Sequence, residues 1–101
     1  MAELDPRHIT DAAHARAQEW VNAGAHWSLT VGSERDGVIA SITCETSRVS
    51  VHLTVQAHGD AEMNVVDQPA HLTSLYRYRL ATSDDVATCL DELTKQIVPS
   101  D

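Results

Sequence analysis

The stretch RVSVHLTVQAH, residues 48 to 58, alternates strictly between apolar and polar side chains. Its apolar members are Val49, Val51, Leu53, Val55 and Ala57, and its polar members are Ser50, His52, Thr54, Gln56 and His58. Alternation with a period of two, in a run rich in β-branched residues, predicts a long strand that is buried on one side. Such a strand needs neighbours on both sides and a layer over its apolar face.

Two earlier segments show the same alternation. Residues 26–32 and 38–45 are predicted to be strands, and the Asp36-Gly37 turn signal between them predicts a hairpin. In the second strand the predicted inward residues are Val38, Ala40, Ile42 and Cys44, and the predicted outward residues are Ile39, Ser41 and Thr43. Thr46-Ser47 then turns the chain into residues 48–58.

Two later segments complete the predicted sheet. A turn at residues 58–60 leads into a short strand over residues 61–66, and Pro69 separates it from a last strand over residues 70–81. One face of the last strand carries Leu72, Ser74, Tyr76, Tyr78 and Leu80, and the other carries His71, Thr73, Leu75, Arg77 and Arg79.

A helix is predicted at each end of this series. Asp5-Pro6 is a helix start, Gly24 is a left-handed helix end, and the apolar stripe between them consists of Ile9, Ala12, Ala13, Ala17, Trp20 and Val21. Thr82 and Asp85 have capping-box spacing at the start of the second helix. That helix presents Val86, Leu90, Leu93 and Ile97, and it ends before Pro99.

This order predicts a single α+β domain over residues 1–101, with residues 1–4 and 99–101 frayed. We expect an antiparallel sheet of four or five strands with both helices packed on one face. The predicted core consists of Trp20, Leu29, Ile42, Val51, Leu53, Val55, Leu90 and Leu93. The predicted open face consists of Ser28, Thr30, Ile39, Ser41, Thr43, Ser50, His52, Thr54, Gln56, Thr73, Leu75, Arg77 and Arg79.

Charge and composition narrow the class of function. The net charge is −8 and only seven residues are Lys or Arg, which disfavours binding to nucleic acid or to an anionic membrane. No apolar run approaches the roughly 20 residues of a membrane span, and no signal peptide opens the sequence. We therefore expect a cytoplasmic protein. Six arginines against one lysine suggest a high-GC bacterium or its phage.

The sequence predicts no metal, no cofactor and no catalytic constellation. His52 and His58 share a strand face but lie about 20 Å apart at ~3.3 Å per residue, which is too far for one ion. Cys44 and Cys89 fall on predicted inward faces and are interpreted as reduced and structural. No glycine-rich loop or serine elbow is present. Whether the chain is an enzyme stays open, with a non-enzyme favoured.

The open polar face is the feature that predicts function. Its candidate binding residues are Ile39, His52, Thr54, His71, Leu75, Arg77 and Arg79. Arg77 and Arg79 project the same way and would either grip a carboxylate or phosphate or pair with acids on a neighbouring strand.

The favoured hypothesis is a protein-binding module that uses this face as an adaptor, an inhibitor or a chaperone-like protein. The alternative is a small-ligand or anion binder, or an enzyme, that uses His52, His71, Arg77 and Arg79. We also expect a twofold homodimer, because one patch then serves both subunits. Its contact surface is either the open face, with Ile39 and Leu75 buried, or an edge strand or the helices.

Overall fold

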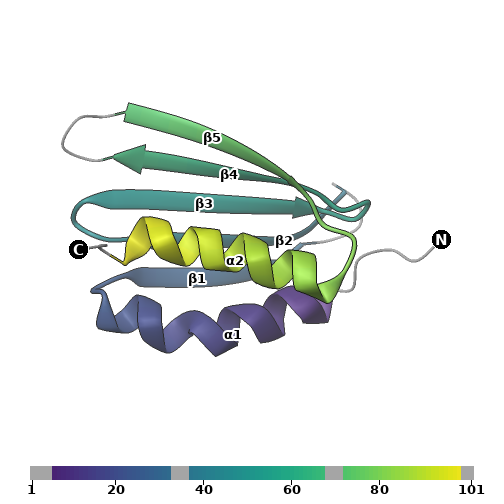
Figure 1. Ribbon diagram of the computed structural model, residues 1–101, viewed down its shortest axis with the longest axis horizontal. Coiled ribbons are helices and arrows are strands. Elements are labelled where there is room, and N and C mark those ends of the chain that lie inside the picture. Colours follow the sequence, from purple (N-terminus) through teal and green to yellow (C-terminus); the bar gives the residue numbers. More distant parts are fainter. Residues whose placement is uncertain (1–5, 33–36, 68–71, 99–101) are drawn as a thin grey trace.

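A computed structural model describes residues 6–32, 37–67 and 72–98 (Figure 1). These residues form α1 (Pro6–Asn22), β1 (His26–Val31), β2 (Val38–Glu45), β3 (Val49–Gln56), β4 (Asp60–Asp67), β5 (Leu72–Arg79) and α2 (Ser83–Ile97). The fold is α+β with the predicted order of elements. The fourth strand is as long as its neighbours, and is longer than the predicted segment 61–66.

The five strands form one antiparallel sheet in the order β1-β2-β3-β4-β5. Each strand pairs with the next one in the sequence, because short turns join antiparallel neighbours. The register brings Leu53 opposite Ile42 on β2 and opposite Met63 on β4, and it brings Met63 opposite Tyr76 on β5. These residues define the face of the sheet that the helices cover.

A β-bulge in β2 corrects one prediction. The pairing of β2 with β3 shifts its register between Val38 and Ala40, so Ile39 is the extra residue. Ile39 is only 7% exposed and belongs to the core cluster. The expectation that Ile39 is exposed on the open face is therefore wrong, because an inserted residue breaks the strict alternation on which that expectation rested.

The hydrophobic core lies between the helices and the centre of the sheet. All the predicted core residues are buried except Leu29, which is partly buried and packs against the core. The two helices also bond to each other: Trp20 Nε1 donates to Thr94 Oγ1 at 2.9 Å, and Arg16 Nε donates to Asp91 Oδ1 at 2.9 Å. The stripe of α1 is narrower than predicted, because Val21 is 53% exposed.

The turns and helix ends are formed by the residues that the sequence indicates. Thr82 and Asp85 make a reciprocal capping box at the start of α2. Gly24, after α1, has a φ of 87°, which favours glycine. Gly59, between β3 and β4, has a φ of 101°, and its carbonyl accepts a hydrogen bond from Leu80 N at 2.8 Å. The predicted helix start at Asp5 lies outside the described residues.

The helices do not cover the whole sheet. α1 packs mainly against β1 and β2, and α2 packs mainly against β3, so that β5 forms the outer edge beyond both helices (Figure 1). Every residue of β5 is exposed except Tyr78, which is half-buried. Within residues 6–32, 37–67 and 72–98, neither helix is long and apolar enough to cross a membrane.

Candidate binding surface

The sheet face opposite the helices, which we call the open face, is dominated by hydroxyl, amide and charged side chains. Strand alternation and register give its members as His26, Ser28, Thr30, Val38, Ser41, Thr43, Glu45, Ser50, His52, Thr54, Gln56, Asp60, Glu62, Asn64, Val66, Thr73, Leu75, Arg77 and Arg79. None of these residues is fully buried.

The register brings five of the seven predicted site residues together. Glu62 lies between Thr54 on β3 and Arg77 on β5. In the next row, Asn64 lies between His52 on β3 and Leu75 on β5. Arg79 lies at the end of the sheet, opposite Asp60.

The remaining two predicted site residues are not part of this arrangement as described. Ile39 is buried at the bulge and does not contribute to an exposed surface. His71 lies outside the described residues.

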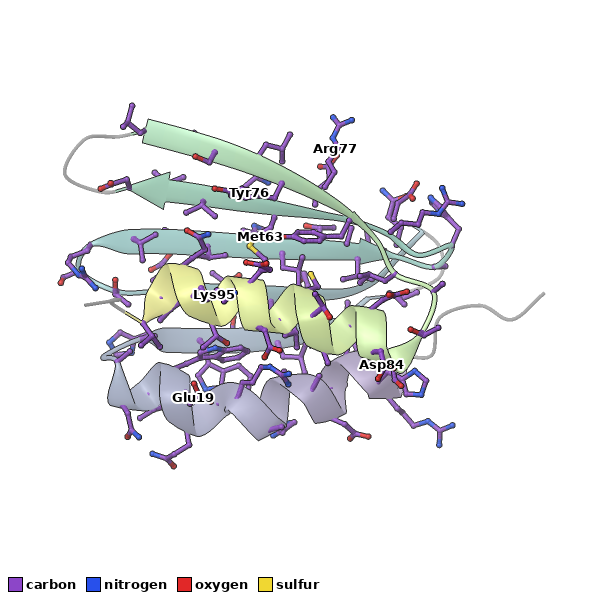
Figure 2. The ribbon with its side chains drawn as sticks, in the orientation of Figure 1. Glu19, Met63, Tyr76, Arg77, Asp84 and Lys95 are labelled. Atoms are coloured by element: carbon purple, nitrogen blue, oxygen red, sulfur yellow. The ribbon has the colours of Figure 1, made fainter. Side chains whose placement is uncertain are left out.

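The arginines pair with acids on the neighbouring strand. Arg77 Nε lies 3.6 Å from Glu62 Oε1, and Arg79 Nε lies 3.7 Å from Asp60 Oδ1. Figure 2 shows Arg77 projecting outward from β5, away from both helices. The side chains of Arg77 and Arg79 are 75% and 81% exposed, so each pair contributes at most about 1 kcal/mol.

Sequence reasoning missed Asp60 and Glu62 as members of this surface. The signal for them is the alternation of β4, in which Ala61, Met63 and Val65 are buried and the residues between them face the other way. Pairing β4 with β5 in register then sets each carboxylate opposite one arginine. The arginines therefore have partners within the sheet.

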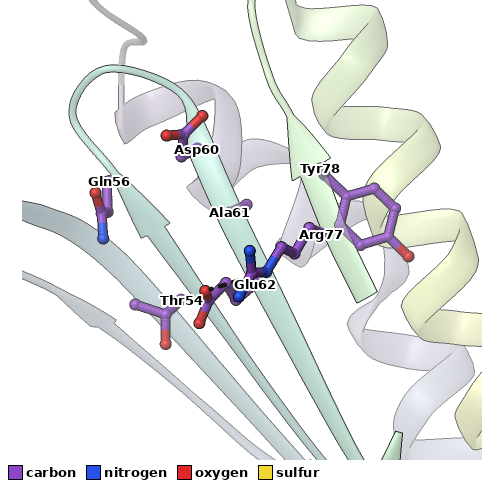
Figure 3. A pocket seen from close by; sticks show the side chains of 7 residues that line it. All are labelled: Thr54, Gln56, Asp60, Ala61, Glu62, Arg77 and Tyr78. Atoms are coloured by element: carbon purple, nitrogen blue, oxygen red, sulfur yellow. Dashed lines mark ion pairs between the residues drawn. The ribbon is translucent and has the colours of Figure 1, made fainter. Parts of the chain in front are cut away.

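A shallow pocket of about 250 Å³ lies where β3, β4 and β5 meet (Figure 3). It is lined by Thr54, Gln56, Asp60, Ala61, Glu62, Arg77 and Tyr78. Its volume is below the ~300–1,000 Å³ that is usual for small-molecule sites. The lining also mixes two carboxylates with one guanidinium that pairs with Glu62. The pocket therefore offers weak selectivity for either sign of charge.

A second hollow, of about 460 Å³, lies at the opposite end of the sheet. Its lining residues are Ala23, Gly24, His26, Glu45, Thr46, Ser47 and Arg48. All of them are exposed or half-buried, so a molecule bound there would remain in contact with water.

The titratable groups near the core are held in their neutral forms. Burial raises the pKa of the Cys44 and Cys89 thiols to about 12, and both cysteines are buried and free, as the sequence predicts. Burial, together with the nearby Cys89, Glu92 and Tyr76, raises the pKa of Tyr78 to about 12. A thiol in this state is a poor nucleophile. In the described part of the chain, no three His, Cys, Asp or Glu side chains cluster as metal ligands would.

The most exposed apolar surface lies on β5 itself. Among the described residues, the large exposed apolar side chains are Val21, Val31, Leu72, Leu75 and Tyr76. Leu72, Leu75 and Tyr76 all belong to β5 and are 66%, 48% and 41% exposed. Leu75 lies on the open face, whereas Leu72 and Tyr76 lie on the helix side beyond α2. This strand is therefore exposed on both of its faces.

In the described part of the chain, no strand pairs with the outer side of β5. Because Leu80 N donates to Gly59 O, alternate residues from Leu80 backward point their N–H and C=O groups toward β4. The backbone groups of the residues between them point away from the sheet. We call these residues, Thr73, Leu75, Arg77 and Arg79, the free edge.

We compared the chain with known proteins by family models, by sequence and by structure. None matched.

Proposed function

We propose that this chain is a non-enzymatic protein-binding module that acts in the cytoplasm as an adaptor, an inhibitor or a small chaperone, and that β5 is its binding element. The observation that carries the proposal is that β5 is exposed on both faces and along one edge. An exposed strand edge is a template for pairing with another chain, and proteins commonly protect such edges.

The protections that usually block a strand edge are scarce on β5. The strand LTSLYRYR contains no proline and no lysine, and its pairing with β4 is regular along its whole length. Its two charged residues, Arg77 and Arg79, are paired with Glu62 and Asp60 on β4. The other edge strand, β1, is shorter, and α1 packs against it, so that Trp27 and Leu29 are partly covered. The two edges of the sheet are therefore unequal, and β5 is the accessible one.

The pairing of the arginines disfavours an anion binder as the alternative function. A phosphate or carboxylate bound at Arg77 and Arg79 would have to compete with Glu62 and Asp60. A ligand held at 100 times its dissociation constant stabilises a protein by about 2.7 kcal/mol. Titration with phosphate or acetate, followed by thermal unfolding, tests this alternative, and we expect no shift specific to either anion.

The test of β5 as the binding element is the substitution Leu75→Pro. Proline removes an N–H group that points away from the sheet, so it removes no hydrogen bond between β5 and β4. Val31→Pro is the matched control on β1. Gly32 N donates to Ile39 O, so Val31 N–H also points outward, and Val31 is 58% exposed.

The experiment measures the affinity of each variant for a purified partner first captured on the wild-type protein. We expect Leu75→Pro to weaken binding by about tenfold or more, which corresponds to 1.4 kcal/mol, and Val31→Pro to leave it unchanged. Amide exchange at the free edge should slow in the complex. Equal affinities for both variants, with free-edge amides unprotected, would show that β5 is not the binding element.

A further inference from the structure

We infer that the strand which pairs with β5 is β5 of a second copy of this chain, antiparallel and centred on Tyr76, so that two sheets join into one. This inference rests on the proposal that β5 is the binding element, and it adds the identity of the partner and the register. The twofold axis lies midway between the two Tyr76 residues and is perpendicular to the sheet. It therefore keeps the helices of both copies on the same side of the joined sheet.

The direction of the backbone groups selects the register. A strand pair related by such an axis sets residues of the same face opposite each other. With Tyr76 on the axis, Leu75 faces Arg77 of the second copy and Thr73 faces its Arg79. All residues of the free edge are then hydrogen-bonded, with two bonds in each pair. Moving the axis to Leu75 would leave Arg79 without a partner within the described strand.

Charge also selects both the register and the partner. With the axis at Tyr76, each arginine lies opposite an uncharged residue, whereas an axis at Arg77 would set two arginines opposite each other, which is unfavourable. Asp60 and Glu62 already lie beside Arg79 and Arg77. A strongly basic strand would be repelled by the two arginines, and a strongly acidic one would have to compete with Asp60 and Glu62 for them. The strand that fits carries aliphatic and hydroxyl residues opposite the charges, as β5 does at Leu75 and Thr73.

The apolar side chains of β5 become covered in this arrangement. Tyr76 meets its own copy across the axis in a non-hydrogen-bonded pair, in which side chains approach most closely. Leu72 lies on the helix side opposite Leu80 of the second copy, which follows β5 and is already buried in its own chain. Leu75 lies against the aliphatic part of the second copy's Arg77 on the open face. Leu72, Leu75 and Tyr76, which one chain leaves exposed, therefore gain contacts in the pair.

The test uses the new cysteine in Tyr76→Cys. Non-hydrogen-bonded partners have Cα atoms about 4.5 Å apart, within the ~4.4–6.8 Å range of disulfides. Cys44 and Cys89 are buried, so the wild-type protein gives the background of cross-linking. Leu75→Cys is the matched variant on the same strand, with a similar native exposure of 48% against 41% for Tyr76. It lies opposite Arg77 of the second copy and not opposite itself.

Under mild oxidation we expect Tyr76→Cys to form a disulfide-linked dimer at least about tenfold faster than Leu75→Cys. The wild-type protein should have twice the chain mass of 11.0 kDa by light scattering, and Leu75→Pro should have the single-chain mass. Faster linkage of Leu75→Cys, or equal rates, would overturn the register. A single-chain mass for the wild type would overturn the inference, and a foreign partner lost only in Leu75→Pro would then leave the proposed function intact.

Discussion

The role of Arg77 and Arg79 is decided by the residues of β4 as much as by those of β5. Their exposure and shared direction are compatible with a ligand site, but the neighbouring strand carries Glu62 and Asp60 in the matching positions. The same residues therefore act as cross-strand pairs that add little stability and that neutralise local charge. The role of a charged residue on a strand therefore depends on the residue opposite it on the neighbouring strand.

Leu53 tests the packing of the core. It is 1% exposed at the centre of the sheet, so Leu53→Ala should lower the free energy of unfolding by about 2–5 kcal/mol, through lost burial and the cavity that remains. Chemical denaturation measures this loss. His52→Ala is the matched control, because His52 is exposed on the other face, and it should change stability by less than about 0.5 kcal/mol. Equal losses of stability for the two variants would mean that the buried and exposed faces of β3 are wrongly assigned.

Asp85 gives a pH-dependent prediction. Hydrogen bonds from the backbone N–H groups of Ala81 and Thr82 favour the carboxylate and lower the pKa of Asp85 below its ordinary value. A carboxyl whose pKa is lower in the folded state stabilises the fold above the unfolded-state pKa of about 3.9, and that contribution is lost as pH falls through the folded-state pKa. Asp85→Asn should therefore be less stable than the wild type at pH 7 and approach it below about pH 4.

Thermal unfolding of Asp85→Asn and the wild type across this pH range is the measurement. Asp84→Asn is a useful control, because Asp84 lies in the same turn but makes no part of the capping box. A gap in unfolding temperature that stayed constant from pH 7 to pH 3 would show that the carboxylate charge is not the source of the effect.

Ile39 shows where reasoning from single residues stops. The sequence predicts the faces of β3 correctly, because alternation there is unbroken and its inward residues are buried. In β2 the alternation is interrupted by one inserted residue, and Val38, Ile39 and Ala40 are all compatible with an inward position. A bulge depends on how two strands pair, so the residues of one strand do not reveal it.

At the scale of elements, the turn before β4 is constrained by the end of β5. A Cβ added to Gly59 would meet the carbonyl oxygen of Leu80, in addition to the strain of a φ of 101°. Gly37 has a φ of 76°, and apart from its chain neighbours no atom of the described residues lies within 4 Å of an added Cβ. Gly37→Ala should therefore cost only about 1–2 kcal/mol, and Gly59→Ala should cost clearly more. Urea unfolding compares the two, and equal losses would contradict the close contact with Leu80.

The periodicity of the sequence does not predict that β5 is exposed on both faces. The alternation of Leu72, Ser74, Tyr76 and Tyr78 predicts that they share a face, and the register agrees. The alternation does not predict whether a helix covers that face. Two helices packed against each other through Trp20 and Thr94 are too narrow a layer to cover five strands, and the strand left uncovered depends on where they dock.

At the scale of the whole molecule, net charge opposes self-association. Each copy carries −8, so two copies repel at long range, while pairing at β5 brings no like charges directly opposite each other. Added salt should therefore strengthen the dimer, because it screens the repulsion and leaves the backbone hydrogen bonds intact. Sedimentation equilibrium in ~20 mM and ~200 mM sodium chloride measures this effect. A dimer that weakened in salt would indicate an interface built on ion pairs.

The contact between the two helices also limits when the core can be completed during synthesis of the chain. Trp20 bonds to Thr94, which is 74 residues later, whereas β2, β3, β4 and β5 pair with strands made immediately before or after them. On a growing chain the strands can therefore begin to pair while α1 still lacks α2, because local contacts form first. Because α1 leaves the ribosome before α2, Trp20 would thus lack its Thr94 partner until α2 has followed.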